Sequence, residues 1–85
     1  MPRPFSLHWG KGIISEEASC ITPYHQPTIQ LLEFEDGSKA LRFCYYTAGR
    51  FQRSPLIIGE DHLGMLREEI KASPKIKDLL RKLVL

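Results

Sequence analysis

The chain has few of the features that identify an enzyme, a membrane protein or a secreted protein. Its two cysteines, Cys20 and Cys44, form no CxxC pair, which predicts free thiols in a reducing cytosol. No apolar run approaches the roughly 18 residues that a membrane helix needs. The N-terminal MPRPFSLHWG lacks the apolar stretch of a signal peptide. We therefore expect a cytoplasmic protein without a membrane partner.

The polar residues show no spacing typical of a catalytic or metal site. A zinc site needs three or four convergent ligands, and His8, His25 and His62 lie far apart along the chain. Adjacent acids such as Glu68-Glu69 point apart on a helix or strand, so they make no acid/base couple. The sequence leaves open a catalytic Cys–His pair whose members come together only in the fold, but nothing marks either thiol as activated. The sequence predicts no enzyme, no metal and no cofactor.

Charge is low in total but unevenly distributed. The 85 residues carry a net charge of +2. Residues 33–36 and 60–70 are acidic, whereas residues 37–59 and 71–85 are basic, and such blocks create a local field that the total hides. This length predicts a single domain over residues 1–85 with a thin core. We expect a homodimer, which would bury more surface.

Strand patterns occupy the first two thirds of the chain. TIQLLEFE and KALRFCYY flank Asp36-Gly37, a strong hairpin signal, and TAGR makes a second turn before a third strand, FQRSPLII. Pro55 in that strand indicates an edge or a bulge. Residues 1–12, rich in Pro and Gly, leave open a loose arm or a short strand. Together with a strand near IISEEASCI, these patterns predict an antiparallel meander of about four strands.

Helix patterns follow Gly59. Leu63, Leu66 and Ile70 recur at helical spacing, and Ser73-Pro74 predicts the N-cap and first position of a second helix. That helix has an apolar stripe opposite a basic face. Strands followed by helices predict an α+β fold: the antiparallel meander and then two C-terminal helices.

The stretch RFCYYTAGRFQRSPLII, residues 42–58, is rich in aromatic and basic side chains. It holds four aromatic residues and three arginines and no acid. Binding to single-stranded nucleic acid needs cations for the phosphates and flat rings on which bases stack. A sheet whose arginines solvate one face while its aromatics fill the other would have the same composition. The candidate nucleic-acid-binding residues are Lys39, Arg42, Tyr46, Arg50, Phe51 and Arg53.

The order of elements over residues 28–70 resembles the single-stranded-DNA-binding domain of transcriptional positive cofactor four and, more distantly, the Whirly proteins. The likeness lies in a strand, a Gly turn, a strand ending in aromatics, a basic turn, the apolar Leu56-Ile57-Ile58, a short acidic link and a helix. This chain departs from the family pattern where it has Cys44, Thr47 and Ser54-Pro55. The resemblance implies a dimer and a role in transcription or DNA maintenance.

Two functions follow as alternatives. The first is a homodimeric protein that binds single-stranded nucleic acid through the basic aromatic stretch. The second is a protein-interaction module or homodimeric scaffold without nucleic-acid affinity, in which the stripe of Ile76, Leu79, Leu80 and Leu83 docks on a partner.

Overall fold

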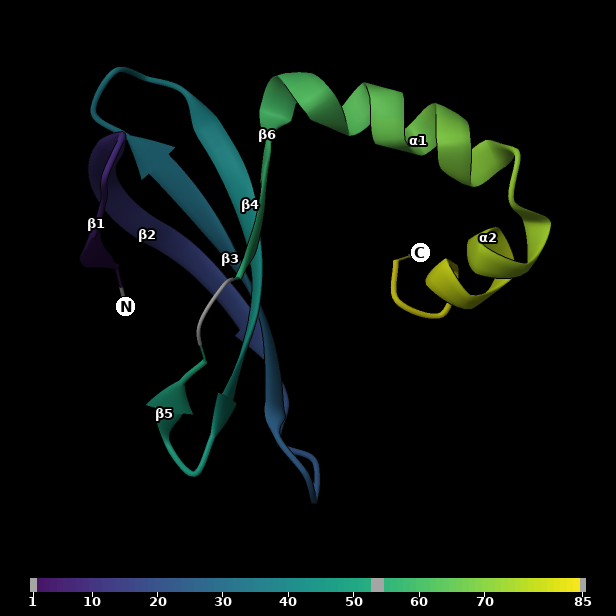
Figure 1. The fold of residues 1–85 in the computed structure, drawn as a ribbon, viewed down its shortest axis with the longest axis horizontal. Coiled ribbons are helices and arrows are strands. Elements are labelled where there is room, and N and C mark those ends of the chain that lie inside the picture. The colour runs from purple at the N-terminus through teal and green to yellow at the C-terminus, as the bar shows by residue number, and fades with distance from the viewer. Residues whose placement is uncertain (1, 53–54, 85) are drawn as a thin grey trace.

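The computed structural model describes residues 2–52 and 55–84. It confirms the α+β fold, an antiparallel sheet followed by two C-terminal helices (Figure 1), with more strands than the sequence predicted. The elements in order are β1 (Arg3–Leu7), β2 (Gly10–Ser19), β3 (Gln26–Phe34), β4 (Lys39–Thr47), β5 (Arg50–Phe51), β6 (Leu56–Gly59), the 3₁₀ turn η1 (Glu60–His62), α1 (Leu63–Lys71) and α2 (Pro74–Leu80).

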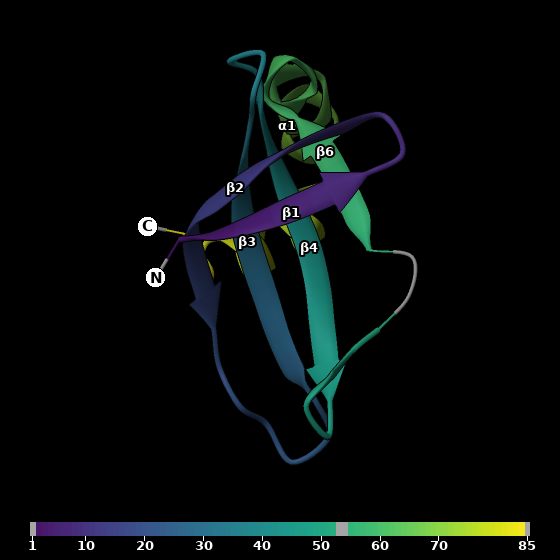
Figure 2. The same cartoon turned by 90° about the vertical axis from the view of Figure 1, so that its left-hand side faces the viewer.

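The sheet is strongly curled because β2 bends. Its register to β3 shifts between Ile14 and Glu16, which leaves Ser15 as an extra residue, and such a bulge bends a strand. The first half of β2 pairs with β1, and the bend carries both across the sheet. Figure 2 shows β1 crossing over β3 and β4, while the helices lie behind the sheet. We call the side under β1 the inner face and the other side the outer face.

The hydrophobic core lies on the inner face. Phe5 of β1 and Ile14 of β2 pack with Leu32 of β3 and Ala40 of β4, and Ile57 of β6 adds to this cluster. On β4 the even-numbered residues from Ala40 to Cys44 are buried, whereas Leu41 and Phe43 on the outer face are only half-buried. The core therefore depends on the curl of β2, since a flat sheet would leave this face without β1.

Both predicted turns are present and adopt backbone angles that favour glycine. Gly37 follows Asp36 with φ of 91°, and the Asp36 Oδ1 accepts hydrogen bonds from the Ser38 amide and hydroxyl. In the second turn Ala48 and Gly49 have φ of 53° and 80°, the combination of a type I′ hairpin turn. Ala48 is the strained member, because its Cβ crowds the backbone in this region.

Two local expectations need correction and one alternative is decided. The segment FQRSPLII is not one strand: Arg50–Phe51 and Leu56–Gly59 pair separately with β4, and Pro55 lies between them. Of the two alternatives for residues 1–12, the short strand is present, because Arg3–Leu7 pairs with the first half of β2. Ser73 does precede the second helix, but its hydroxyl bonds back to the Glu69 carbonyl rather than capping that helix.

The helices leave the sheet instead of packing on it. α1 runs away from the end of β6, and α2 turns back so that the C-terminal segment faces the sheet across a gap (Figure 1). Neither helix buries a residue. Across the described ranges, no helix is long and apolar enough to span a membrane. Of the apolar stripe predicted for the second helix, Ile76, Leu79 and Leu83 are exposed within one chain, Leu80 is half-buried, and Leu83 lies beyond the end of α2.

Candidate nucleic-acid interface

Arg42, Tyr46 and Phe51 meet on the inner face, beside β1. Arg42 and Tyr46 project from β4 at an even spacing, and Phe51 of β5 pairs directly with Tyr46. The guanidinium carbon of Arg42 lies 5.0 Å from the centroid of the Phe51 ring, a cation–π contact. The Tyr46 ring meets Phe51 edge-on at 5.4 Å. These contacts orient the Phe51 ring, which is still 41% exposed.

A chain of hydrogen bonds supports this cluster from the floor of the sheet. Gln30 of β3 is fully buried, and its Oε1 accepts a 2.7 Å hydrogen bond from the Arg42 Nε. The Gln30 Nε2 donates to the Glu17 Oε2 at 2.6 Å. Arg3 of β1 donates to both oxygens of Glu17, at 3.0 and 2.7 Å. Four elements are thus joined by one polar network, which fixes the position of Arg42.

The network also sets the ionisation of its members. The ion pair with Arg3, and then the hydrogen bond from Gln30, hold the pKa of Glu17 below its usual range. The same Glu17 carboxylate raises the pKa of Arg3. Both charges are therefore present at neutral pH. Glu17 is neutralised by Arg3, whereas Arg42 is only 9% exposed and forms no ion pair with the described residues.

The structure brings together half of the six residues that the sequence singled out. Arg42, Tyr46 and Phe51 form the cluster. Lys39 is exposed on the outer face, and the rise of about 3.3 Å per residue places it roughly 23 Å along β4 from Tyr46. Arg50 is exposed at the tip of the β4–β5 turn, opposite Thr47. Arg53 lies outside the described residues.

Burial of Arg42 differs from the expectation for a solvated basic face. The inner face carries the core at one end and the polar network at the other, so Arg42 sits beneath Phe51 rather than in water. Arg3, Glu17 and Gln30 were not predicted as site residues. Gln30 does alternate with buried Thr28 and Leu32, so a polar residue on an apolar face was a usable signal. Arg3 and Glu17 gave none, because only the curl of β2 joins them to the network.

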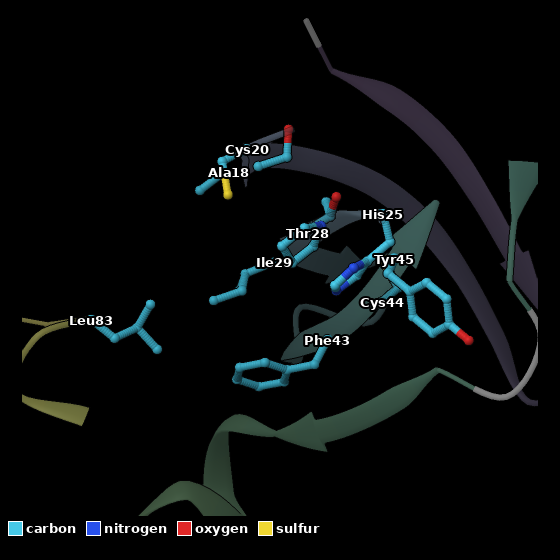
Figure 3. Close-up of a pocket in the computed structure, with 11 residues that line it drawn as sticks. Ala18, Cys20, His25, Thr28, Ile29, Phe43, Cys44, Tyr45 and Leu83 are labelled. Atoms are coloured by element: carbon cyan, nitrogen blue, oxygen red, sulfur yellow. The ribbon is translucent and has the colours of Figure 1, made fainter. Parts of the chain in front are cut away.

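The outer face carries a second feature, an apolar hollow of about 570 Å³. Ile29 and Phe43 form its floor, and Leu83 of the C-terminal segment points toward them across the gap (Figure 3). The His25 and Tyr45 rings meet edge-on at its rim, 5.6 Å apart. With few polar groups, this hollow offers packing surface rather than catalytic chemistry. Its lining residues are Ala18, Ser19, Cys20, His25, Pro27, Thr28, Ile29, Phe43, Cys44, Tyr45 and Leu83.

The two thiols have different surroundings. Cys20 is exposed at the end of β2, and Cys44 is buried on β4, and neither forms a disulfide. Burial raises the pKa of the Cys44 thiol, which disfavours the reactive thiolate. No three His, Cys, Asp or Glu side chains converge on a metal-sized space in the part of the chain that the structure describes.

Comparison with protein families, curated proteins and solved structures finds no match for this chain. The resemblance to positive cofactor four stays a prediction from the sequence. The features of the molecule that bear on function are the inner-face cluster, the outer-face hollow and the exposed apolar side chains of the C-terminal segment.

Proposed function

We propose that this protein binds single-stranded nucleic acid on its inner face. The observation that carries the proposal is the Phe51 ring, which is exposed yet held in place by Arg42 and Tyr46. An aromatic ring that is exposed to water is stabilised when a flat partner stacks on it. Every nucleobase has such a flat face, so stacking on Phe51 would not depend on the base sequence. Arg50 pairs with Thr47 and so projects from the other side of β5, but at the tip of the adjacent turn it is an exposed cation for the phosphates of a strand that passes over the turn.

Fluorescence anisotropy with labelled single- and double-stranded oligonucleotides tests the proposal. Phe51→Leu keeps an apolar side chain but removes the ring, and we expect it to lose about 1–3 kcal/mol of single-strand affinity. Tyr24→Leu is the matched control, since Tyr24 is an exposed ring in the β2–β3 loop that takes no part in the contacts of the cluster. Arg50→Ala should reduce the salt slope of single-strand binding by about 0.7. No affinity for single strands at low salt would refute the proposal.

We also propose that two chains associate through the outer face and the C-terminal helices. Apolar side chains are exposed on both surfaces, and Leu79 and Leu83 are 66% and 60% exposed. The hollow above Ile29 and Phe43 is open to the same side as this stripe. A twofold axis would let each chain cover the apolar surfaces of the other, because such an interface uses the same patch twice. Dimerisation would also complete a thin core.

Sedimentation velocity at micromolar concentration distinguishes this dimer from the protein-interaction alternative. The double variant Leu79→Gln/Leu83→Gln should convert the dimer to a monomer. The control Lys75→Gln/Lys82→Gln changes exposed lysines in the same C-terminal segment and should remain a dimer. A wild-type monomer would instead favour a module whose stripe of Ile76, Leu79 and Leu83 receives another protein.

A further inference from the structure

Arg42 carries a buried charge whose counter-ion is missing from its surroundings. The residue is only 9% exposed; its Nε donates a hydrogen bond to Gln30, and its guanidinium lies against the face of the Phe51 ring. In residues 2–52 and 55–84, no carboxylate pairs with Arg42 and no oxygen atom accepts a hydrogen bond from its Nη1 or Nη2 atoms, and these two atoms are not fully buried, so a ligand can reach them. A largely covered guanidinium is generally paired, so this arrangement favours an anion from a ligand.

Glu17 does not supply that anion. It reaches Arg42 only through Gln30, and both of its oxygens already accept hydrogen bonds from Arg3. The network of Arg3, Glu17 and Arg42 therefore has one guanidinium in excess. The Nε of Arg42 is held at 2.7 Å by the buried Gln30, which leaves the terminal nitrogens as a fixed fork. Such a fork matches the paired oxygens of a phosphate.

The neighbouring ring points to a nucleotide as the source of the phosphate. Phe51 is 41% exposed and lies directly over the Arg42 guanidinium. A base that stacks on this ring brings its own phosphate to the edge of the ring, next to the fork. One exposed ring and one buried arginine thus make a site for a single nucleotide, whereas the exposed Arg50 at the turn can follow the rest of a strand.

Burial further selects the kind of phosphate. An internal phosphodiester has a sugar on each side and needs room for both, but Arg42 is nine-tenths covered. A terminal phosphate monoester has one attached sugar, three free oxygens and a charge of about −1.5 to −2 at neutral pH. We infer that the site of Arg42, Gln30 and Phe51 binds the phosphorylated end of a nucleic-acid strand. This inference rests on the proposed single-strand binding and names the part of the strand that is recognised.

The test compares strands of roughly ten nucleotides that differ only at their ends, by fluorescence anisotropy with the label at the opposite end. One pair carries a 5′-phosphate or a 5′-hydroxyl, and a second pair carries a 3′-phosphate or a 3′-hydroxyl. We expect one phosphorylated end to bind about tenfold more tightly than its hydroxyl counterpart. Competition by a nucleoside monophosphate is compared with competition by the corresponding nucleoside. This comparison tells whether the phosphate that binds can come from a free nucleotide or must come from the end of a strand.

Arg42→Gln should bring the ratio between phosphate and hydroxyl ends close to one, whatever its absolute affinity. Arg67→Gln, which removes an exposed arginine from α1, should retain the preference and so controls for total charge. Equal affinity of phosphate and hydroxyl ends in the wild-type protein would overturn the inference while leaving single-strand binding intact. Absence of binding to every strand would overturn both. If Arg42→Gln does not fold, equal competition by nucleoside and monophosphate in the wild-type protein overturns the inference.

Discussion

Replacing Gln30 with leucine removes the side chain that joins Glu17 to Arg42. The leucine matches the volume of glutamine and suits a fully buried position, so the perturbation is the loss of hydrogen bonds rather than a cavity. The Arg42 Nε loses the acceptor that lies 2.7 Å away and stays buried. The Glu17 carboxylate loses a 2.6 Å donor but is partly exposed, so water can replace it.

The loss in the free energy of unfolding depends on which group is left unpaired. A hydrogen bond to a charged group contributes about 1.5–3 kcal/mol, and a buried unpaired donor adds a desolvation penalty of similar size. Burial of two methyl groups in place of the carboxamide offsets roughly 1 kcal/mol of this. We expect a net loss of about 3 kcal/mol in the free energy of unfolding, which for a domain of this size lowers Tm by about 12–24 °C. This loss is a large share of the total free energy of unfolding of a small domain.

Thermal and urea unfolding followed by circular dichroism measure this loss. Gln26→Leu is the matched control, because the Gln26 amide bonds the Ser19 hydroxyl in an exposed position, and it should change stability by less than about 0.5 kcal/mol. In the double variant Gln30→Leu/Arg42→Met the buried charge is also removed, so stability should recover. Two results would refute the reasoning: a Gln30→Leu protein as stable as wild type, or a double variant no more stable than the single one.

Three further predictions concern the backbone and the ion pair. Gly12→Ala should cost at least about 2 kcal/mol by urea unfolding, because a Cβ there would overlap the Glu33 carbonyl; an unchanged midpoint would contradict the register of β2. Ala48→Gly should raise stability by up to about 1 kcal/mol, since relief of the left-handed strain exceeds the added chain entropy, and a lower Tm would count against this turn. Arg3 depresses the pKa of Glu17 in the folded state, so the pair stabilises the protein above the unfolded value of about 4.3, and this contribution is lost as pH falls through the folded pKa. The acid limb of stability between pH 6 and 2 should therefore be shallower in Glu17→Gln, by about 1 kcal/mol for a partly exposed pair, and parallel curves would disprove the assignment.

The local pattern of the sequence was enough to predict the central hairpin and the helices. Asp36-Gly37 predicted the β3–β4 turn, and the alternation along KALRFCYY correctly placed Arg42 and Tyr46 on one side of β4. The leucine spacing after Gly59 predicted α1, and Ser73-Pro74 predicted the start of α2. These features depend on turn geometry and on the periods of helix and strand, which act between residues close in sequence.

Only the tertiary structure decided which side of the sheet is buried and what the arginine on it contacts. Both faces of β4 carry aromatic and apolar side chains, so alternation alone could not show that the face of Arg42 becomes the inner one. The bulge at Ser15 decides this, because it folds β1 over that face and brings Arg3 to Glu17 across 14 positions of sequence. Gln30 then meets Arg42 across 12 positions. Such contacts depend on strand register and sheet curvature, which arise when distant segments pair, and a pattern read along neighbouring residues does not contain them.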